Sequence, residues 1–183
     1  LITENRYELS AAMVMEMGKN RIEALGDVEE TADLLRWYCF QMEQNDGYFR
    51  QMNSFGPTDT NVSVMKPYGV WAVIAPFNFP LNLVVHKVGP AIAAGCPVVL
   101  KPASQTPFSS LALASMLIDE CGLPAEYLQV VTGGGGTVGN ALVDHPDVAL
   151  ITFTGSPEVG WGIRARAPRK RVGLELGNNA PCI

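Results

Sequence analysis

The 183-residue sequence lacks any uninterrupted apolar run long enough to cross a bilayer. Its richest apolar stretch, from Val70 to Leu83, is broken by Pro76 and Pro80. It also lacks an excess of basic residues, because 13 Lys and Arg stand against 18 Asp and Glu and give a net charge of −5. A mildly acidic chain is poorly suited to bind nucleic acid or an anionic membrane surface. We therefore expect neither nucleic acid nor a membrane among its partners.

Cysteine and histidine are scarce, and neither has the spacing of a metal site. The four cysteines, at positions 39, 96, 121 and 182, form no Cys-x-x-Cys pair, and His86 is far in sequence from His145. We predict no metal ion, four reduced thiols that serve as small core side chains, and a cytoplasmic location. Both histidines are interpreted as structural, His86 on an apolar helix and His145 in a turn.

Both ends of the sequence are abrupt. It starts in a helix-like pattern without an initiating Met or a basic-then-apolar signal, and it stops inside an apolar run at Pro181-Cys182-Ile183. We expect a piece of a longer protein, in which residues needed for function can be missing. The apolar share of 48% and charged share of 17% still predict a folded chain with a sizeable core.

The first fifty residues predict helices. Apolar residues recur at helical spacing from 4 to 18, and a second helix is expected to open at Asp27, which would cap it, and to end near 45–47. Turn residues at 56–61 follow, and then a short strand at 62–64.

From Val70 onward, predicted strands and helices alternate. Strands are expected at 70–75, 98–100, 128–131, 148–153 and 171–176. Helices are expected at 84–94, from Thr106-Pro107 (as N-cap and first residue) to Gly122, from the glycine run to about 144, and after Ser156 to about 167. The alternation implies an α/β fold, with an open parallel sheet that has helices on both faces and is preceded by the N-terminal helices.

Four of the expected strand ends carry residues suited to chemistry. They are Pro76-Phe77-Asn78, Lys101-Pro102, Thr154-Gly155-Ser156 and Glu175-Leu176-Gly177. Ligands of open parallel sheets bind beyond the carboxyl ends of the strands. The coincidence of four such ends therefore points to a binding site more strongly than any single motif.

Two glycine motifs could hold a dinucleotide. Gly134-x-Gly136-x-x-Gly139 matches the usual fingerprint in form, but the acidic residue it needs is absent from the next strand end, so a plain glycine turn is favoured. Gly155-Ser156 precedes a helix whose unpaired N–H groups suit a pyrophosphate. Ser156 could contact the phosphate or serve only as the helix N-cap.

Three polar residues have both a functional and a structural interpretation. Lys101 could face a cofactor's ribose or phosphate, or extend to solvent from a sheet edge. Asn78, in a loop between two prolines, could donate to a developing oxyanion or simply form a turn. Glu175, at an apolar strand end, could be a partly desolvated general base. It could instead form a structural ion pair with an Arg or Lys among residues 164–171.

Taken together, four segments resemble the aldehyde dehydrogenase superfamily, and the resemblance extends from about Glu8 to the end of the chain. The segments are 76–80 (PFNFP), 100–107 (LKPASQTP), 153–160 (FTGSPEVG) and 174–177 (LELG). The resemblance implies a Rossmann-like NAD(P)-binding domain at 68–177, with N-terminal helices at 1–51 packed on it. It also implies a hairpin of the oligomerisation element at 52–67 and the start of a truncated catalytic domain at 178–183.

The resemblance implies oxidation of an aldehyde to a carboxylic acid through a cysteine thiohemiacetal and thioester, with NAD or NADP as hydride acceptor. Asn78 would donate to the oxyanion, and Glu175 would be the general base. The implied partners are a small aldehyde or semialdehyde and, in the full-length protein, copies of itself in a homodimer or homotetramer. The implied cofactor-binding residues are Ile74, Ala75, Pro76, Phe77, Lys101, Ser104, Gly135, Gly155, Ser156, Val159, Gly160 and Leu176.

Three departures from the family pattern matter. The family's nucleophilic cysteine lies a few dozen residues beyond the glutamate, so the 183 residues alone are expected to be inactive. Ser104 stands where many NAD-specific members have Glu, which removes a repulsion toward a 2′-phosphate and permits NADP. Asn178 replaces a second glycine after Gly177. The alternatives are a reductase without a covalent intermediate and a non-catalytic dinucleotide-binding module.

Overall fold

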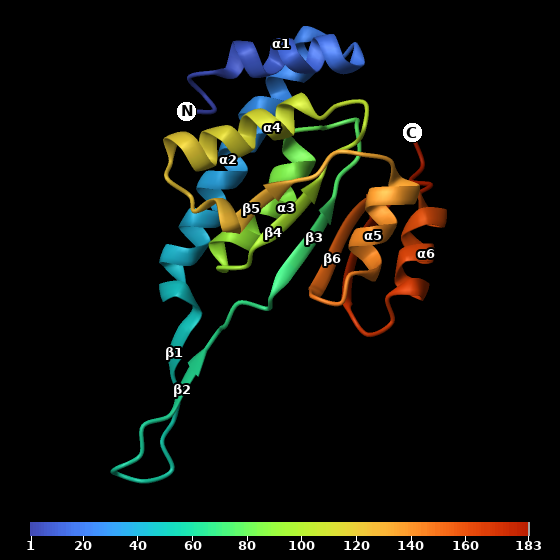
Figure 1. Ribbon diagram of the computed structural model, residues 1–183. Helices are drawn as coiled ribbons and strands as arrows, with labels where there is room; N and C mark the ends of the chain where they lie inside the picture. The colour runs from blue at the N-terminus through green and yellow to red at the C-terminus, as the bar shows by residue number, and fades with distance from the viewer. Residues whose placement is uncertain (183) are drawn as a thin grey trace.

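The computed structural model describes residues 1–182, in which two helices and a hairpin precede an alternation of strands and helices (Figure 1). The helices are α1 (Arg6–Met17), α2 (Arg21–Gln44), α3 (Asn82–Ala93), α4 (Phe108–Ser115), α5 (Asn140–Asp144) and α6 (Pro157–Arg166). The strands are β1 (Phe49–Gln51), β2 (Val62–Val64), β3 (Val70–Ile74), β4 (Val98–Lys101), β5 (Leu128–Val130), β6 (Val148–Gly155) and β7 (Arg171–Leu176). Short 3-10 segments at 46–48 and 125–127 and π-helical turns at 116–120 and 135–139 complete the elements.

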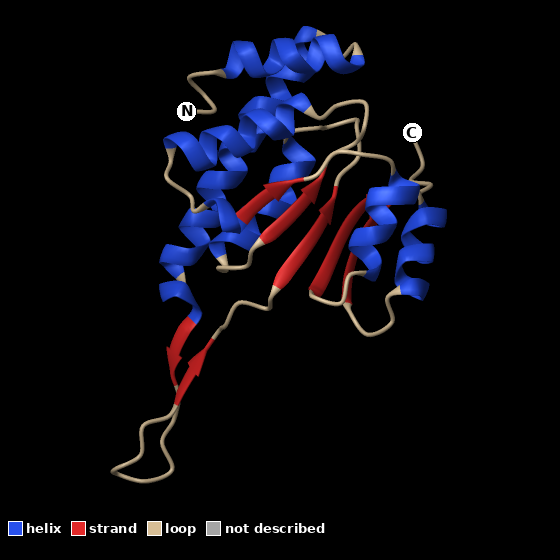
Figure 2. Ribbon diagram, in the orientation of Figure 1, coloured by secondary structure: helices blue, strands red, loops and turns tan. Residues whose placement is uncertain are grey.

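The predicted open parallel sheet is confirmed. Its five strands lie in the order β5-β4-β3-β6-β7, and all neighbours are parallel. Ile74, at the end of central β3, is in register with Lys101 of β4 on one side and Phe153 of β6 on the other. The predicted functional strand ends therefore lie along a single edge of the sheet (Figure 2).

Helices cover both faces of this sheet, and central β3 is therefore buried on both sides. Val73 belongs to a core shared with α1, α2, α3 and α4, whereas Ala72 and Ile74 belong to a second core shared with α5 and α6. The antiparallel β1–β2 hairpin is separate from both cores, and its six residues are exposed. It extends away from the body of the molecule (Figure 1). No helix within residues 1–182 is both long and apolar enough to cross a membrane.

Two predicted helix starts are wrong. Helix α2 begins at Arg21, where the Asn20 side chain accepts a hydrogen bond from the Glu23 N–H at 2.9 Å. Asp27 is instead buried inside the helix, because it pairs with Lys19. Helix α4 begins at Phe108 without a side-chain cap, and the hydroxyl of Thr106 is buried without a hydrogen-bond partner among the described residues.

The prediction of four core thiols is wrong for three of them. Cys96 is buried, but Cys39, Cys121 and Cys182 are exposed. Cys39 lies on a solvent-facing side of α2, and Cys121 follows the π-helical turn that ends the α4 segment. A scattered cysteine carries no sequence signal of its own for the face of a helix on which it falls.

Candidate functional site

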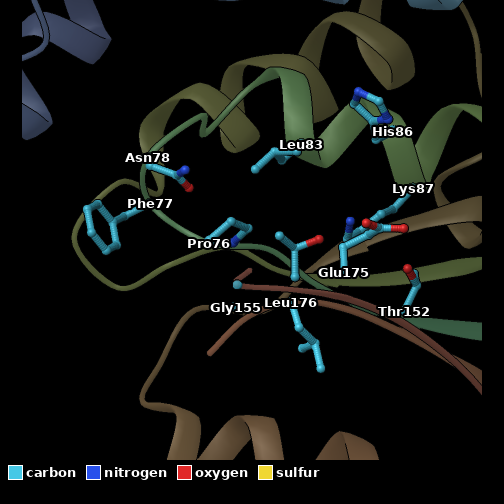
Figure 3. A pocket seen from close by; sticks show the side chains of 12 residues that line it. Pro76, Phe77, Asn78, Leu83, His86, Lys87, Thr152, Gly155, Glu175 and Leu176 are labelled. Atoms are coloured by element: carbon cyan, nitrogen blue, oxygen red, sulfur yellow. The ribbon is translucent and has the colours of Figure 1, made fainter. Parts of the chain in front are cut away.

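A cavity of about 790 Å³ opens at the carboxyl ends of β3, β6 and β7 (Figure 3). Its walls come from the loop after β3, from the first turns of α3, and from the ends of the two other strands. The lining residues are Pro76, Phe77, Asn78, Leu83, His86, Lys87, Thr152, Thr154, Gly155, Glu175, Leu176 and Gly177. The cavity thus brings together both predicted catalytic residues and four of the predicted cofactor-binding residues.

Asn78 lies in the loop between β3 and α3. Its side chain is directed into the cavity (Figure 3), and no described group accepts or donates a hydrogen bond to its amide. Its backbone carbonyl, in contrast, accepts a hydrogen bond of 3.0 Å from the Lys19 ammonium. The amide is therefore available to a ligand while the backbone that carries it is held.

Glu175 faces the same cavity from the end of β7, in register with Thr154 of β6. The predicted partial desolvation is wrong in this chain, because β7 is the edge strand of the sheet and Glu175 is exposed. No ion pair among the described residues joins Glu175 to the basic residues at 164–171. The alternative interpretation of Glu175 as a structural ion-pair residue is therefore not supported either.

Lys87 on α3 is a cavity residue that the sequence interpretation missed. It is 4% exposed, and this burial lowers the pKa of its ammonium, while the negative charge of Glu175 acts in the opposite direction. A single lysine within the apolar run 81–92 was the available signal. His86, interpreted as structural, is exposed and also lines the cavity.

A second group of predicted residues lies at the ends of β4 and β5. Lys101 is only 4% exposed, so it does not extend to solvent, and its ammonium donates to the Pro102 carbonyl at 2.9 Å. Burial lowers the pKa of this ammonium. Exposed Ser104 donates to the Gly133 carbonyl at 2.9 Å and ties the two loops together. A Cβ on Gly135 would meet nothing within 4 Å, so that glycine lies beside open space.

The start of α6 directly follows β6, so it belongs to the first group of strand ends. Ser156 is its N-cap and accepts the Val159 N–H at 3.4 Å, so the capping interpretation is confirmed, and the serine hydroxyl still has its own proton to donate. Gly155 and Gly160 each lie close against a neighbouring side chain. A Cβ on Gly155 would lie 2.5 Å from the Phe153 ring, and a Cβ on Gly160 would overlap the end of the Leu176 side chain.

These features fit a dinucleotide. A capped helix N-terminus attracts a pyrophosphate, and Lys101 supplies a cation two strands away at the same edge of the sheet. Thr154, in the cavity wall, has a buried hydroxyl without a hydrogen-bond partner among the described residues. Ile74 and Ala75 are buried, so they can offer a ligand only their backbone. No group of His, Cys, Asp and Glu within residues 1–182 could hold a metal ion.

Comparison with known proteins decides the family. The sequence model described as the aldehyde dehydrogenase family matches residues 1–183. The chain belongs to the aldehyde dehydrogenase family. This confirms the resemblance inferred from its four motifs.

Relatives of this aldehyde dehydrogenase family chain include semialdehyde dehydrogenases. It is 43% identical to the glutarate-semialdehyde dehydrogenase of Pseudomonas aeruginosa and 42% identical to the succinate-semialdehyde dehydrogenase [NADP(+)] of Escherichia coli. Each alignment covers 100% of the chain but 38% of the relative. The chain therefore spans well under half the length of the curated relatives it matches.

Solved structures share the fold. A crystal structure described as an E. coli NADP-dependent enzyme matches with a TM-score of 0.90 and 41% identity over 98% of this chain and 37% of that chain. The glyceraldehyde-3-phosphate dehydrogenase of Methanocaldococcus jannaschii, solved in complex with NADP, matches with a TM-score of 0.84 and 32% identity over 97% of this chain and 39% of that chain.

Proposed function

We propose that this chain is the cofactor-binding part of an NAD(P)+-dependent aldehyde dehydrogenase, whose longer protein oxidises a small aldehyde or semialdehyde to the carboxylic acid. The observation that carries the proposal is the cavity that holds an unpaired amide, Asn78, and a carboxylate, Glu175, beside a capped helix N-terminus. A module that only binds a nucleotide needs neither an oxyanion donor nor a base. The semialdehyde dehydrogenases among the relatives support the substrate class.

We assign the cofactor contacts along the sheet edge. Lys101 and Ser104 would hold the adenosine ribose, and Gly135 and Val159 would flank the adenine. Gly155, Ser156 and Gly160 would form the pyrophosphate site at the start of α6. The cofactor path would be lined by Ile74, Ala75, Pro76, Phe77 and Leu176.

Either NAD or NADP fits this site. When bound, the cofactor supplies the hydride acceptor. Ser104 carries no charge to repel a 2′-phosphate, and the NADP-bound structure from M. jannaschii supports NADP use.

The chain's own groups would act on the aldehyde carbon and on water. The Asn78 amide would donate to the oxygen of the attacked carbonyl, where negative charge develops. Glu175 would accept a proton from the water that hydrolyses the thioester. None of the four cysteines lines the cavity, so we place the nucleophile outside these 183 residues.

We also propose the arrangement of the longer protein. The helices within residues 1–51 would pack on the NAD(P)-binding domain at 68–177, and the catalytic domain would begin at 178–183. The hairpin at 52–67 would contribute to a homodimer or homotetramer, because it protrudes and exposes apolar side chains such as Phe55 and Met65.

The general base is tested by Glu175→Gln in the full-length protein. A general base contributes about 10²–10⁴-fold, so we expect steady-state kcat to fall by at least about 10²-fold. Reduction of one cofactor per site should persist as a pre-steady-state burst, because hydride transfer precedes hydrolysis. Glu126→Gln, an exposed carboxylate outside the cavity, is the matched control and should change neither.

The outcomes separate the alternatives. An unchanged kcat in Glu175→Gln contradicts the proposed role. A full-length protein that binds NAD(P)+ but turns over no aldehyde supports the non-catalytic module. Turnover with no dependence on any cysteine supports a reductase without a covalent intermediate.

A further inference from the structure

Lys19, in the turn between α1 and α2, makes three contacts although it is only 8% exposed. Its ammonium lies 3.0 Å from an Asp27 carboxylate oxygen and donates to the Asn78 carbonyl at 3.0 Å. It also lies 3.5 Å from the centre of the Phe79 ring. The buried Lys19 ammonium thus connects the turn between α1 and α2 to the loop between β3 and α3, which lines the cavity.

Asp27 extends the same connection to the far end of the loop. Its second oxygen accepts the backbone N–H of Asn82, the first residue of α3, at 2.8 Å. The carboxylate is 1% exposed, and burial raises its pKa against the opposing effects of that N–H and of Lys19. A single ion pair therefore holds the loop that carries Asn78 at its middle and at its junction with α3.

Stability alone is a weak explanation for this pair. Removing two charges from water costs several kcal/mol per ion, and well-packed apolar residues often replace a buried pair without loss. Apolar residues could not hydrogen-bond to the Asn78 carbonyl. The bond from Lys19 does so, and it fixes the orientation of one peptide plane at Asn78. That plane is one of the two that meet at the Asn78 Cα, so it constrains where the Asn78 side chain enters the cavity.

We propose that Lys19 and Asp27 are positioning residues that set the orientation of the Asn78 amide toward the substrate oxygen. This inference rests on the proposed function, in which Asn78 donates to the oxyanion. A preorganised donor is effective only when its geometry is fixed before the charge develops. The pair supplies that fixation from a segment about sixty residues earlier in the sequence.

The test is a double-mutant cycle in the full-length protein, with Lys19→Met, Asn78→Ala and the combination. A misplaced catalytic group can cost up to about 10²-fold, and we expect Lys19→Met to lower kcat by about tenfold. The dissociation constant for NAD(P)+ should change by less than about twofold. In the Asn78→Ala background, Lys19→Met should cause no further loss, and Lys19→Arg alone should restore part of the activity.

Two further variants keep the result interpretable. Lys19→Met/Asp27→Leu removes both charges, so it avoids an unpaired buried carboxylate, and it should show the same loss of kcat. Arg36→Met disrupts the exposed Arg36–Asp33 pair on α2 and should leave kcat unchanged.

Each outcome has one meaning. An unchanged kcat in Lys19→Met, or an equal loss in the wild-type and Asn78→Ala backgrounds, overturns this inference and leaves the proposed function standing. An unchanged kcat in Asn78→Ala overturns the inference together with the role of Asn78 on which it rests.

Discussion

Lys101 shows how a residue proposed to bind the cofactor can oppose stability. The burial of its ammonium lowers its pKa in the folded chain below that in the unfolded chain. The unfolded chain therefore binds this proton more tightly, and the cost of the buried charge is fully present below the folded-state pKa. Stability should recover as pH rises through that pKa toward the unfolded value.

Lys101→Met should separate stability from binding. We expect a higher melting temperature at neutral pH, with a gain that shrinks at alkaline pH, because the buried charge is gone. Hydrogen bonds to charged groups contribute about 1.5–3 kcal/mol, so NAD(P)+ should bind roughly tenfold to a hundredfold more weakly. Thermal unfolding and cofactor titration measure the two effects, and Lys66→Met, an exposed lysine outside the site, should show neither. A destabilised variant with unchanged affinity would contradict this account.

Single residues were also the least predictable part of the site. Asn78 and Glu175 were found because each falls in a motif at a strand end, and the structure brings both into one cavity. Lys87 was missed because its partner, Glu175, is distant in sequence and only the fold brings the two charges together. The exposure of Glu175 and of three cysteines could not be inferred from the sequence. It depends on which other elements pack against the strand or helix that carries each residue.

At the scale of elements, the position of α6 depends on the closeness of its approach to β7. Gly160 faces the Leu176 side chain, whereas Gly162, two residues later on the same helix, has nothing within 4 Å of where a Cβ would lie. The two glycines therefore form a matched pair in which a methyl group at Gly160, but not at Gly162, requires the Leu176 side chain to move.

Gly160→Ala should displace α6 and the proposed pyrophosphate site at its start. Overpacking typically costs about 1–3 kcal/mol, and we expect a loss of that size together with weaker NAD(P)+ binding. Gly162→Ala should instead be neutral or stabilise by up to about 1 kcal/mol, since alanine favours a helix. Chemical denaturation of both variants checks the difference, and equal effects would show that the contact with Leu176 is unimportant.

Most elements were predictable, but their first residues were less so. Periodicity and β-branched runs located the five sheet strands to within a few residues. The start of α2 was mistaken because Asn20 and Asp27 are both good caps, whereas the Asp27 carboxylate binds Lys19 before the helix and the distant Asn82 N–H. Local capping rules cannot include a partner from outside the helix.

At the scale of the whole molecule, the alternation of strands and helices was enough to predict the parallel sheet, and the structure confirms it. It did not predict how the cavity would be closed. In the described chain one wall ends at edge strand β7, which leaves Glu175 exposed.

The isolated 183-residue chain should therefore show no dehydrogenase turnover. It holds the proposed oxyanion donor and base, but none of its cysteines lines the cavity. The measurement is NAD(P)H formation from an aliphatic aldehyde by the purified chain, with the full-length protein as control. Turnover that disappears on alkylation of its cysteines would contradict this.

The central position of β3 also bears on how the chain is made. One neighbour, β4, follows soon in the sequence, but the other, β6, begins only at Val148. Synthesis proceeds at about 5–20 residues per second, so one side of β3 stays unpaired for several seconds after β4 is available. An apolar strand with a free edge is what chaperones bind, and the nascent chain is most in need of their protection in that interval.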